Sequence, residues 1–272
     1  MRSPTRRVDL HTRRWEPVGT SEPKPSTDHF SAVAGEYATH RPGYPTELAR
    51  ALAEASPETG SVWEVGCGSG QLTFRLASRF RRVWATDLSR SQLAQAPPLA
   101  GVLYVAARAE ECPLSGASVD LIVAAQAAHW FDLDSFYAEV RRVARPGALL
   151  ALVSYGLMRI SPEVDRVVHR FHQETLAPHW PPERRHVDAG YRTLPFPFPR
   201  VTMPALECRV EWSLERFLGY VETWSGVGRL VADGGAAELA ALRREVTLAW
   251  GDPSQRPIRW PLHILSGRVE AD

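Results

Sequence analysis

The stretch Val62–Gly70, VWEVGCGSG, decides the fold, because a short apolar run ends directly in three glycines spaced two residues apart. Glycine lets the backbone turn sharply and lets a ligand approach the main chain closely. The stretch Leu72–Phe80 follows with a helical pattern, in which Leu72 and Leu76 lie one turn apart. A strand, a glycine loop and a helix in this order are typical of an α/β sheet that binds a ligand beyond its strand ends.

The alternation of short apolar runs and helical patterns continues along the chain and predicts a parallel sheet with helices on both faces. Thr46 is expected to cap a helix before the first strand, and Asp134 to begin the helix that Arg145-Pro146-Gly147 ends. The expected strands are Val62–Val65, Val83–Thr86, Val102–Val105, Val119–Ala124, Ala148–Val153, Glu207–Trp212 and Ile258–Leu265.

Four segments of different composition divide the 272 residues. Residues 1–28 have no apolar periodicity and predict a disordered tail. Residues 29–155 form the predicted ligand-binding core, beginning with a helix near Phe30 to Tyr37. Residues 156–205 contain eight prolines and predict an insertion that covers the substrate, and residues 206–272 complete the sheet.

The composition excludes several classes of protein. The chain is 44% hydrophobic and carries a net charge of +1, which disfavours both overall disorder and generic binding to nucleic acid. The tail contributes +2 (six basic, four acidic residues) and residues 29–272 contribute −1 (26 basic, 27 acidic). The chain has three dispersed cysteines, and its sequence shows neither an apolar leader nor an apolar run long enough to span a membrane. We therefore expect a soluble cytoplasmic protein without a membrane partner.

The glycine spacing separates two kinds of cofactor. A dinucleotide fingerprint reads G-x-G-x-x-G, whereas this chain has G-x-G-x-G and places Gln71 where the third fingerprint glycine belongs. Asp87 ends the second predicted strand, 17 residues after Gly70. A carboxylate there can accept hydrogen bonds from both hydroxyls of a ribose, and Leu88 would flank the base.

Five segments, in the same order, resemble the class I S-adenosylmethionine (SAM)-dependent methyltransferases, in the type-11 and trans-aconitate-methyltransferase-like branch. The sequence departs from that pattern at Arg108, where the family has Asp, and at Ala107, where it has Gly. The matching segments are Phe30–Pro45, Glu64–Gly70, Arg108–Leu114, Val119–Asp132 and Arg142–Gly147.

The resemblance implies a Rossmann-like fold, with a seven-stranded, mostly parallel sheet and an antiparallel final strand. It also implies a lid, formed by the inserted residues 156–205 and by the N-terminal helix near Phe30 to Tyr37. It also implies SAM as the cofactor. His129 would be a general base if the acceptor needs one, and Trp130, Tyr155 and Trp224 would line the substrate pocket. The residues implied to bind the cofactor are Tyr37, Arg41, Glu64, Gly66, Gly68, Gly70, Asp87, Leu88, Ala109, Glu110 and Gln126.

The function expected on this basis is methyl transfer to a small-molecule acceptor in specialised metabolism, with a carboxylate, hydroxyl, amine or carbon as the accepting group. One alternative is a SAM-binding protein without transfer, either a regulator or a rearrangement enzyme; another is an NAD-dependent oxidoreductase. No nucleic-acid partner and no metal are expected, and the oligomeric state stays open. Four histidines are expected to be solvated or to face the substrate: His169, His172, His179 and His186.

Overall fold

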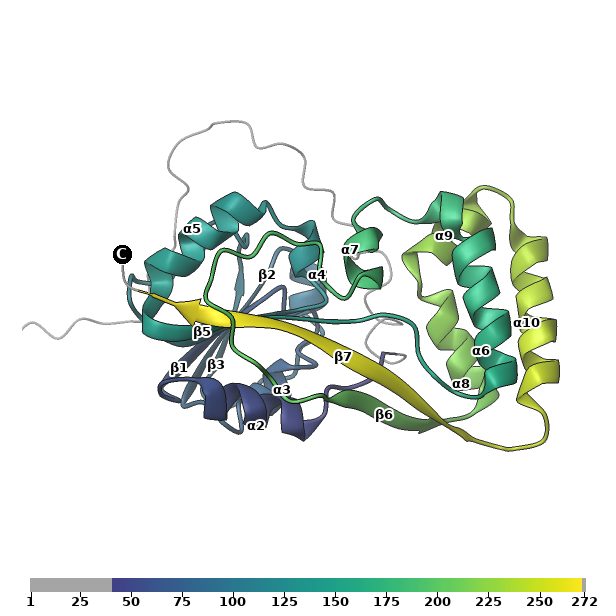
Figure 1. Ribbon diagram of the computed structural model, residues 1–272, viewed down its shortest axis with the longest axis horizontal. Helices are drawn as coiled ribbons and strands as arrows, with labels where there is room; N and C mark the ends of the chain where they lie inside the picture. Colours follow the sequence, from purple (N-terminus) through teal and green to yellow (C-terminus); the bar gives the residue numbers. More distant parts are fainter. Residues whose placement is uncertain (1–40, 271–272) are drawn as a thin grey trace, which may run out of the picture.

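The fold is built on one seven-stranded sheet with the strand order β3-β2-β1-β4-β5-β7-β6 (Figure 1). The computed structural model describes residues 41–270, so the predicted tail and the helix containing Tyr37 lie outside the described residues. The strands are β1 (Ser61–Val65), β2 (Arg82–Asp87), β3 (Val102–Ala106), β4 (Val119–Ala125), β5 (Ala144–Tyr155), β6 (Glu207–Trp212) and β7 (Arg256–Val269).

Strands β1 to β5 pair in parallel, and β7 runs antiparallel to both β5 and β6. This confirms the predicted seven-stranded, mostly parallel sheet with an antiparallel final strand. The chain builds β1, β2 and β3 toward one edge and then returns to place β4 on the other side of β1. Such a reversal of strand order leaves a crevice at the carboxyl ends of β1 and β4, where sheets of this kind bind ligands.

Helices cover both faces of the sheet, which explains why its central strands are apolar without alternation. Side chains of successive strand residues point to opposite faces. In β4, Leu121 and Val123 belong to the core beneath α2, whereas Ile122 and Ala124 belong to the core beneath α5. The helices are α2 (Thr46–Ala55), α3 (Thr73–Leu76), α4 (Arg90–Leu93), α5 (Leu133–Val143), α6 (Pro162–Arg170), α7 (Arg184–Asp188), α8 (Leu214–Glu222), α9 (Ser225–Ala232) and α10 (Ala236–Trp250).

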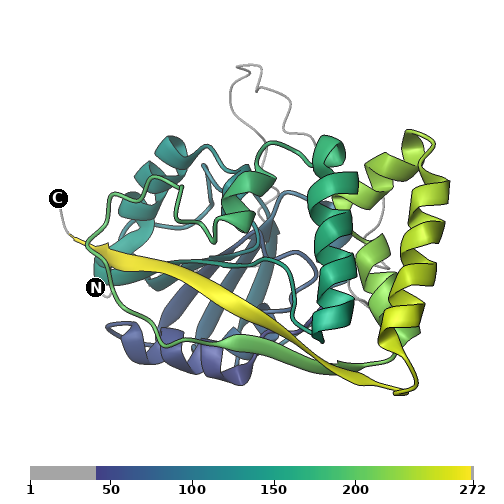
Figure 2. The ribbon, with the colours of Figure 1, turned by 45° about the vertical axis from the view of Figure 1, so that its right-hand side comes forward.

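Helices α6, α8, α9 and α10 form a helical layer beside the sheet (Figures 1 and 2). Helix α6 follows the end of β5, α8 follows the end of β6, and α10 precedes the start of β7. The layer therefore lies at the strand ends where the crevice opens. It combines residues from both sides of the predicted boundary at 205/206, because α6 packs against α10. Within residues 41–270 no helix is both long and apolar enough to cross a membrane.

Several predicted element ends are wrong by a few residues. Pro45, not Thr46, is the residue before α2, and no side chain caps that helix. Asp132 caps α5 through the N–H of Ser135, so the helix begins one residue before Asp134. The strand β5 begins at Ala144 and includes Arg145-Pro146-Gly147.

The early start of β5 has a local cause. The pairing of β4 with β5 shifts register opposite Asp120, so the residues after Ala144 bulge out of the ladder. Arg145 Nη1 then lies 2.6 Å from the carboxylate of Asp120, which is buried and also accepts the N–H of Ser61. A buried carboxylate needs such partners, and the bulge supplies one.

Candidate functional site

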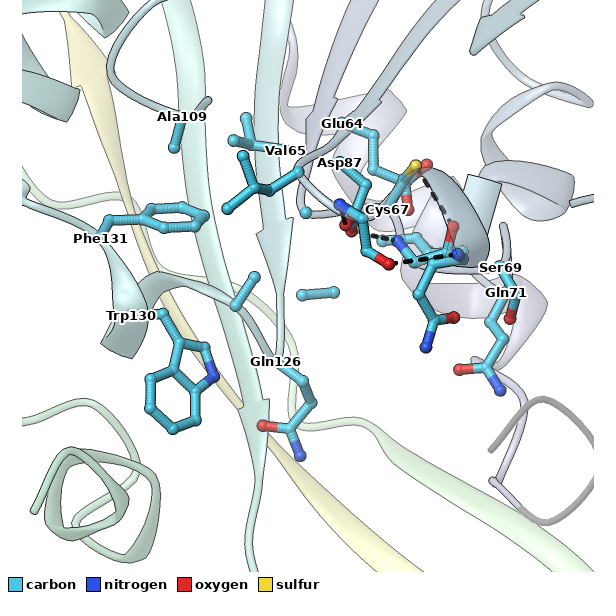
Figure 3. A pocket seen from close by; sticks show the side chains of 18 of the residues that line it. Glu64, Val65, Cys67, Ser69, Gln71, Asp87, Ala109, Gln126, Trp130 and Phe131 are labelled. Carbon is cyan, nitrogen blue, oxygen red and sulfur yellow. Dashed lines mark hydrogen bonds between the residues drawn. The ribbon is translucent and has the colours of Figure 1, made fainter. Parts of the chain in front are cut away.

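A cavity of about 470 Å³ lies at the carboxyl ends of β1, β2 and β4, where the strand order reverses. Figure 3 shows its wall, with the glycine loop on one side and Trp130 and Phe131 on the other. Ten residues predicted for the cofactor or substrate line it together: Glu64, Gly66, Gly68, Asp87, Leu88, Ala109, Glu110, Gln126, Trp130 and Tyr155.

The glycine loop turns sharply because Gly66 and Gly68 adopt φ angles of +68° and +56°. The N–H groups of Gly66 and Cys67 donate to the carbonyl oxygen of Thr86 at 2.8 and 2.9 Å, so the loop is anchored to the end of β2. A Cβ on Gly66 would lie 2.5 Å from the Cβ of Ala127. The loop and the segment after β4 therefore lie so close together that only glycine fits at position 66 without a clash.

Gly70 completes the turn without lining the cavity. Its φ angle is +85°, and its N–H donates to the carbonyl oxygen of Cys67 at 3.0 Å. The third glycine of the motif thus shapes the loop, whereas the first two line the cavity.

Asp87 joins the end of β2 to the glycine loop. Its Oδ2 accepts the N–H of Gly68 and its Oδ1 accepts the N–H of Ser89, both at 2.8 Å. A carboxylate has about four lone-pair sites, so Asp87 can hold the loop and still accept from the hydroxyls of a ribose. The carboxylate is oriented by the backbone before any ligand arrives.

Glu64 is a second carboxyl group in the cavity wall, and only 2% of its surface is exposed. The hydroxyl of Thr73 donates to its Oε2 at 2.5 Å. Burial, reinforced by the nearby charge of Asp87, raises the pKa of Glu64 to about 8. Glu64 therefore carries a proton at neutral pH, whereas a cation placed in the cavity would favour its ionised form.

Two glutamines present buried amide oxygens that have no hydrogen-bond partner within the described residues: Gln92 Oε1 and Gln126 Oε1. Both side chains line the cavity. The amide nitrogen of Gln126 donates to the carbonyl oxygen of Tyr155 at 2.9 Å, and its backbone has a φ of +55°. A buried acceptor without a donor is costly, so these two oxygens indicate where a ligand would donate.

The opposite end of the cavity is formed by the turn after β3. The side chain of Glu110 pairs with Arg108 at 3.4 Å and accepts the N–H of Asp132 at 3.1 Å. Leu88, Ala109 and Phe131 complete an apolar wall that suits a planar base. Arg108, where the family has Asp, thus holds a neighbouring carboxylate.

His129 does not join this set, although its neighbour Trp130 does. Its Nδ1 lies 2.8 Å from the hydroxyl of Tyr191, and its ring packs on Trp130 with centroids 4.9 Å apart. Burial lowers the pKa of His129 to about 3, so the ring is neutral. The geometry makes His129 a neighbour of the cavity wall.

Two further predicted residues lie outside the lining. Trp224 packs among Trp180, Tyr220 and His172, and the guanidinium of Arg41 lies 5.4 Å from the centre of the Tyr220 ring. Both belong to the helical layer and its surroundings. Tyr37 lies outside the described residues.

The sequence reasoning missed the part of the wall that comes from distant segments. Pro181, Pro182 and Glu183 precede α7, and Arg229 comes from α9. No local motif marks them, because packing of the helical layer brings them to the strand ends. Gln92 carried a weak signal, since it follows the helix cap Ser89 by one turn.

The chemistry of the lining fits SAM. Four carboxyl groups line the cavity, and with Glu64 protonated the other three outnumber the two arginines of the lining, which suits a cation. The two unpaired amide oxygens suit N–H or O–H donors of the cofactor, and the volume is within the usual range for small-ligand sites. In this fit, Asp87 would hold the ribose, Leu88 and Ala109 would flank the adenine, and Gln126 would face the methionine part. Within residues 41–270 no three His, Cys, Asp or Glu side chains are grouped to hold a metal ion.

Comparison with known proteins also indicates a methyltransferase. Residues 63–152 match a family model described as a methyltransferase domain. A protein of Dictyostelium discoideum named as a methyltransferase is 32% identical over 251 residues, covering 89% of this chain and 95% of its own length. The malonyl-[acyl-carrier protein] O-methyltransferase of Dechloromonas aromatica is 35% identical over 148 residues, which span 50% of this chain and 53% of that protein.

A solved structure shows a likeness over a similar share of the chain. The structure of a protein from Anaeromyxobacter dehalogenans, titled as a type II methyltransferase, is 49% identical. It superimposes with a TM-score of 0.80 and covers 85% of this chain and 99% of its own. The similarity therefore includes the helical layer as well as the sheet.

Proposed function

Because the chain belongs to the class I SAM-dependent methyltransferases, we propose that it transfers the methyl group of SAM to a small-molecule acceptor in specialised metabolism. The observation that carries this proposal is the cavity at the reversal of strand order, where Gly66, Gly68, Asp87 and Gln126 converge.

When bound, SAM supplies a methyl group that is already electrophilic, because it is attached to a positively charged sulfur. The protein must therefore orient the reactants and exclude water. Asp87 and the glycine loop would fix the nucleoside end, because Asp87 is itself held by two backbone N–H groups. Gln126 would fix the other end, since its amide nitrogen is tied to the carbonyl oxygen of Tyr155.

The wall opposite the glycine loop would hold the acceptor. Trp130 and Tyr155 supply apolar surface, and Pro181 and Pro182 close one side of the cavity. Two charged residues also line the cavity, Arg229 from α9 of the helical layer and Glu183 from the segment before α7. A carboxylate acceptor needs no base, whereas a hydroxyl, amine or carbon acceptor would use a carboxylate such as Glu183 more readily than His129, which does not line the cavity.

Two further observations support parts of this proposal. The relative from Dechloromonas aromatica is an O-methyltransferase, which makes oxygen a candidate for the accepting atom here. We also propose a cytoplasmic location, which is supported by the free, buried thiols of Cys67, Cys112 and Cys208.

Calorimetric titration with SAM and with its demethylated product, S-adenosylhomocysteine (SAH), tests the cofactor. Binding of both at micromolar concentrations is expected, and an absence of binding would overturn the proposal. A parallel titration with NAD distinguishes the oxidoreductase alternative. Methyl transfer is then followed by mass spectrometry with libraries of acids, alcohols and amines. SAM binding without turnover in any library would favour a SAM-binding protein that does not transfer methyl.

A further inference from the structure

A second cavity of about 640 Å³ lies beside the first, between α7, the start of the helical layer and the residues after β5. Pro181 and Pro182 line both cavities, so the two spaces share one wall (Figure 1 shows α7 between the sheet and the helical layer). Its lining residues are Gly156, Leu157, Arg159, His172, Gln173, Ala177, Trp180, Pro181, Pro182, Arg184, Arg185, Asp188, Pro261 and His263.

The lining of this second cavity carries a net positive charge. Three arginines and one aspartate line it, which gives a formal charge of 3 − 1 = +2 with the histidines neutral. Arg184 is neutralised by Asp188, whose Oδ1 lies 2.9 Å from its Nε. Arg159 and Arg185 form no ion pair within 4.0 Å in the described part of the chain. The Nε of Arg185 donates to His186 Nε2 at 3.5 Å, which leaves its charge without an acidic partner. Two guanidinium groups are therefore available to an anion.

His172 adds a second, independent sign of a ligand. The residue is 5% exposed, it lines the cavity, and neither ring nitrogen has a hydrogen-bond partner in the described structure. The carboxylate of Asp188 is 3.8 Å from its Nε2, which is too long for a hydrogen bond. Buried polar atoms without partners are rare in native proteins, because each loses its bonds to water without replacement.

The ring of His172 is held in this position by its surroundings. The rings of Trp180 and Trp224 pack on it at centroid distances of 4.8 and 5.7 Å, and Trp180 Nε1 donates to the His172 carbonyl oxygen at 3.1 Å. Burial lowers the pKa of His172 to about 4, so the neutral ring offers one N–H donor and one acceptor. The imidazole is thus a fixed, buried polar group in the wall of a cavity that also carries three arginines.

We propose that this second cavity binds a carboxylate or phosphate group of the methyl acceptor, with Arg159, Arg185 and His172 as its donors. The inference rests on the proposed function and deepens it. The acceptor would be an acidic small molecule whose anionic end lies in the second cavity. Its methyl-accepting atom would reach past Pro181 and Pro182 into the first cavity. The anionic group would then position the molecule and would not itself be methylated.

The experiment uses the full chain saturated with SAH and titrates it in a calorimeter with two probes, inorganic phosphate and malonate. At least one is expected to bind with a Kd in the millimolar range or below, and the tighter probe identifies the anionic group. The double variant Arg159→Gln/Arg185→Gln should weaken that binding at least tenfold. Arg166→Gln is the matched control, because Arg166 is an exposed arginine of α6 that lines neither cavity.

His172→Phe separates binding from folding. The variant keeps an aromatic ring between the two tryptophans and removes both nitrogens, so anion binding should weaken while the protein unfolds at an unchanged or higher temperature. If neither probe binds, or if the double variant binds like the wild type, the proposal is overturned. SAH affinity is measured in every variant and should not change. Titrating the probes without SAH decides the chemistry of the second cavity even if SAH fails to bind, which would overturn only the proposed function.

Discussion

The N–H of Gly68 donates to Oδ2 of Asp87 at 2.8 Å, so the end of β2 and the glycine loop after β1 are joined through the carboxylate predicted to bind the ribose. The two motifs are separate in the sequence and act as one unit in the structure. A ligand that contacts Asp87 therefore meets a group whose position the loop already determines, and a change at Asp87 also loosens the loop.

Asp87→Ala should weaken SAM binding by at least tenfold, because a hydrogen bond to a charged group contributes about 1.5–3 kcal/mol. His129→Ala should change SAM affinity much less, since His129 does not line the cavity. Calorimetry on both variants checks the ranking. The opposite order would show that the cofactor lies elsewhere.

Gly66→Ala should destabilise the protein more than Gly147→Ala. Both glycines have left-handed φ angles, +68° and +78°, which cost an alanine about 1–2 kcal/mol. Only at Gly66 would the new Cβ collide, 2.5 Å from the Cβ of Ala127, while nothing lies within 4 Å of it at Gly147. Urea unfolding of the two variants isolates the collision, and equal losses would mean that the loop can move aside.

Gln92→Leu should separate stability from affinity. The Oε1 atom of Gln92 is buried without a partner, so its replacement removes an unfavourable desolvation and should leave the unfolding free energy unchanged or higher. The same change should weaken SAM binding several-fold, because a donor on the ligand loses its acceptor. Thermal unfolding and calorimetry on one sample measure both effects. Unchanged affinity would exclude Gln92 from the cofactor site.

Glu64→Gln should remove a pH dependence of stability. The folded protein holds the Glu64 proton up to a pKa of about 8, whereas the unfolded chain releases it near 4.5. The stability that the protonated group supports is complete below about pH 4.5 and is lost as the pH rises toward 8. The loss is at most about 1.4 kcal/mol per pH unit.

The measurement is urea unfolding of the cofactor-free protein at pH 5, 6, 7 and 8. The variant should gain stability relative to the wild type as the pH rises through this range. Parallel curves for the two proteins would show that Glu64 ionises in the folded state as easily as in water.

The fold could be predicted because its signals are local. The apolar runs at β1 and β4, the glycine loop after Val65 and the helix cap Ser89 each specify a conformation from neighbouring residues alone. Element ends were harder, as at Ala144, where the start of β5 depends on a bulge opposite Asp120. The sequence pattern does not indicate helix α9, because four of the residues in the range 225–232 are Ser, Gly or Ala and show little helical periodicity.

The site residues could be predicted only where a local motif or the end of a predicted strand marks them. Asp87 ends β2 and Gln126 directly follows β4, and the carboxyl ends of parallel strands meet at one edge of a sheet. Pro182 and Arg229 reach the same cavity through packing of helices distant in sequence, which no spacing rule shows. His129 and Trp130 are adjacent in a short 3₁₀ turn, and only the structure shows that one lines the cavity and the other contacts Tyr191.

The strand β7 has a consequence for how the chain can be divided. It pairs along its second half with β5 and along its first half with β6, and it therefore lies between them. Removing everything after Tyr155 would turn the fully buried second half of β5 into an open sheet edge, with apolar side chains and unpaired backbone groups facing water. Such an edge templates aggregation. The strands that line the first cavity thus depend on β7 for their solubility, so the helices before β7 can change while the strand itself must stay.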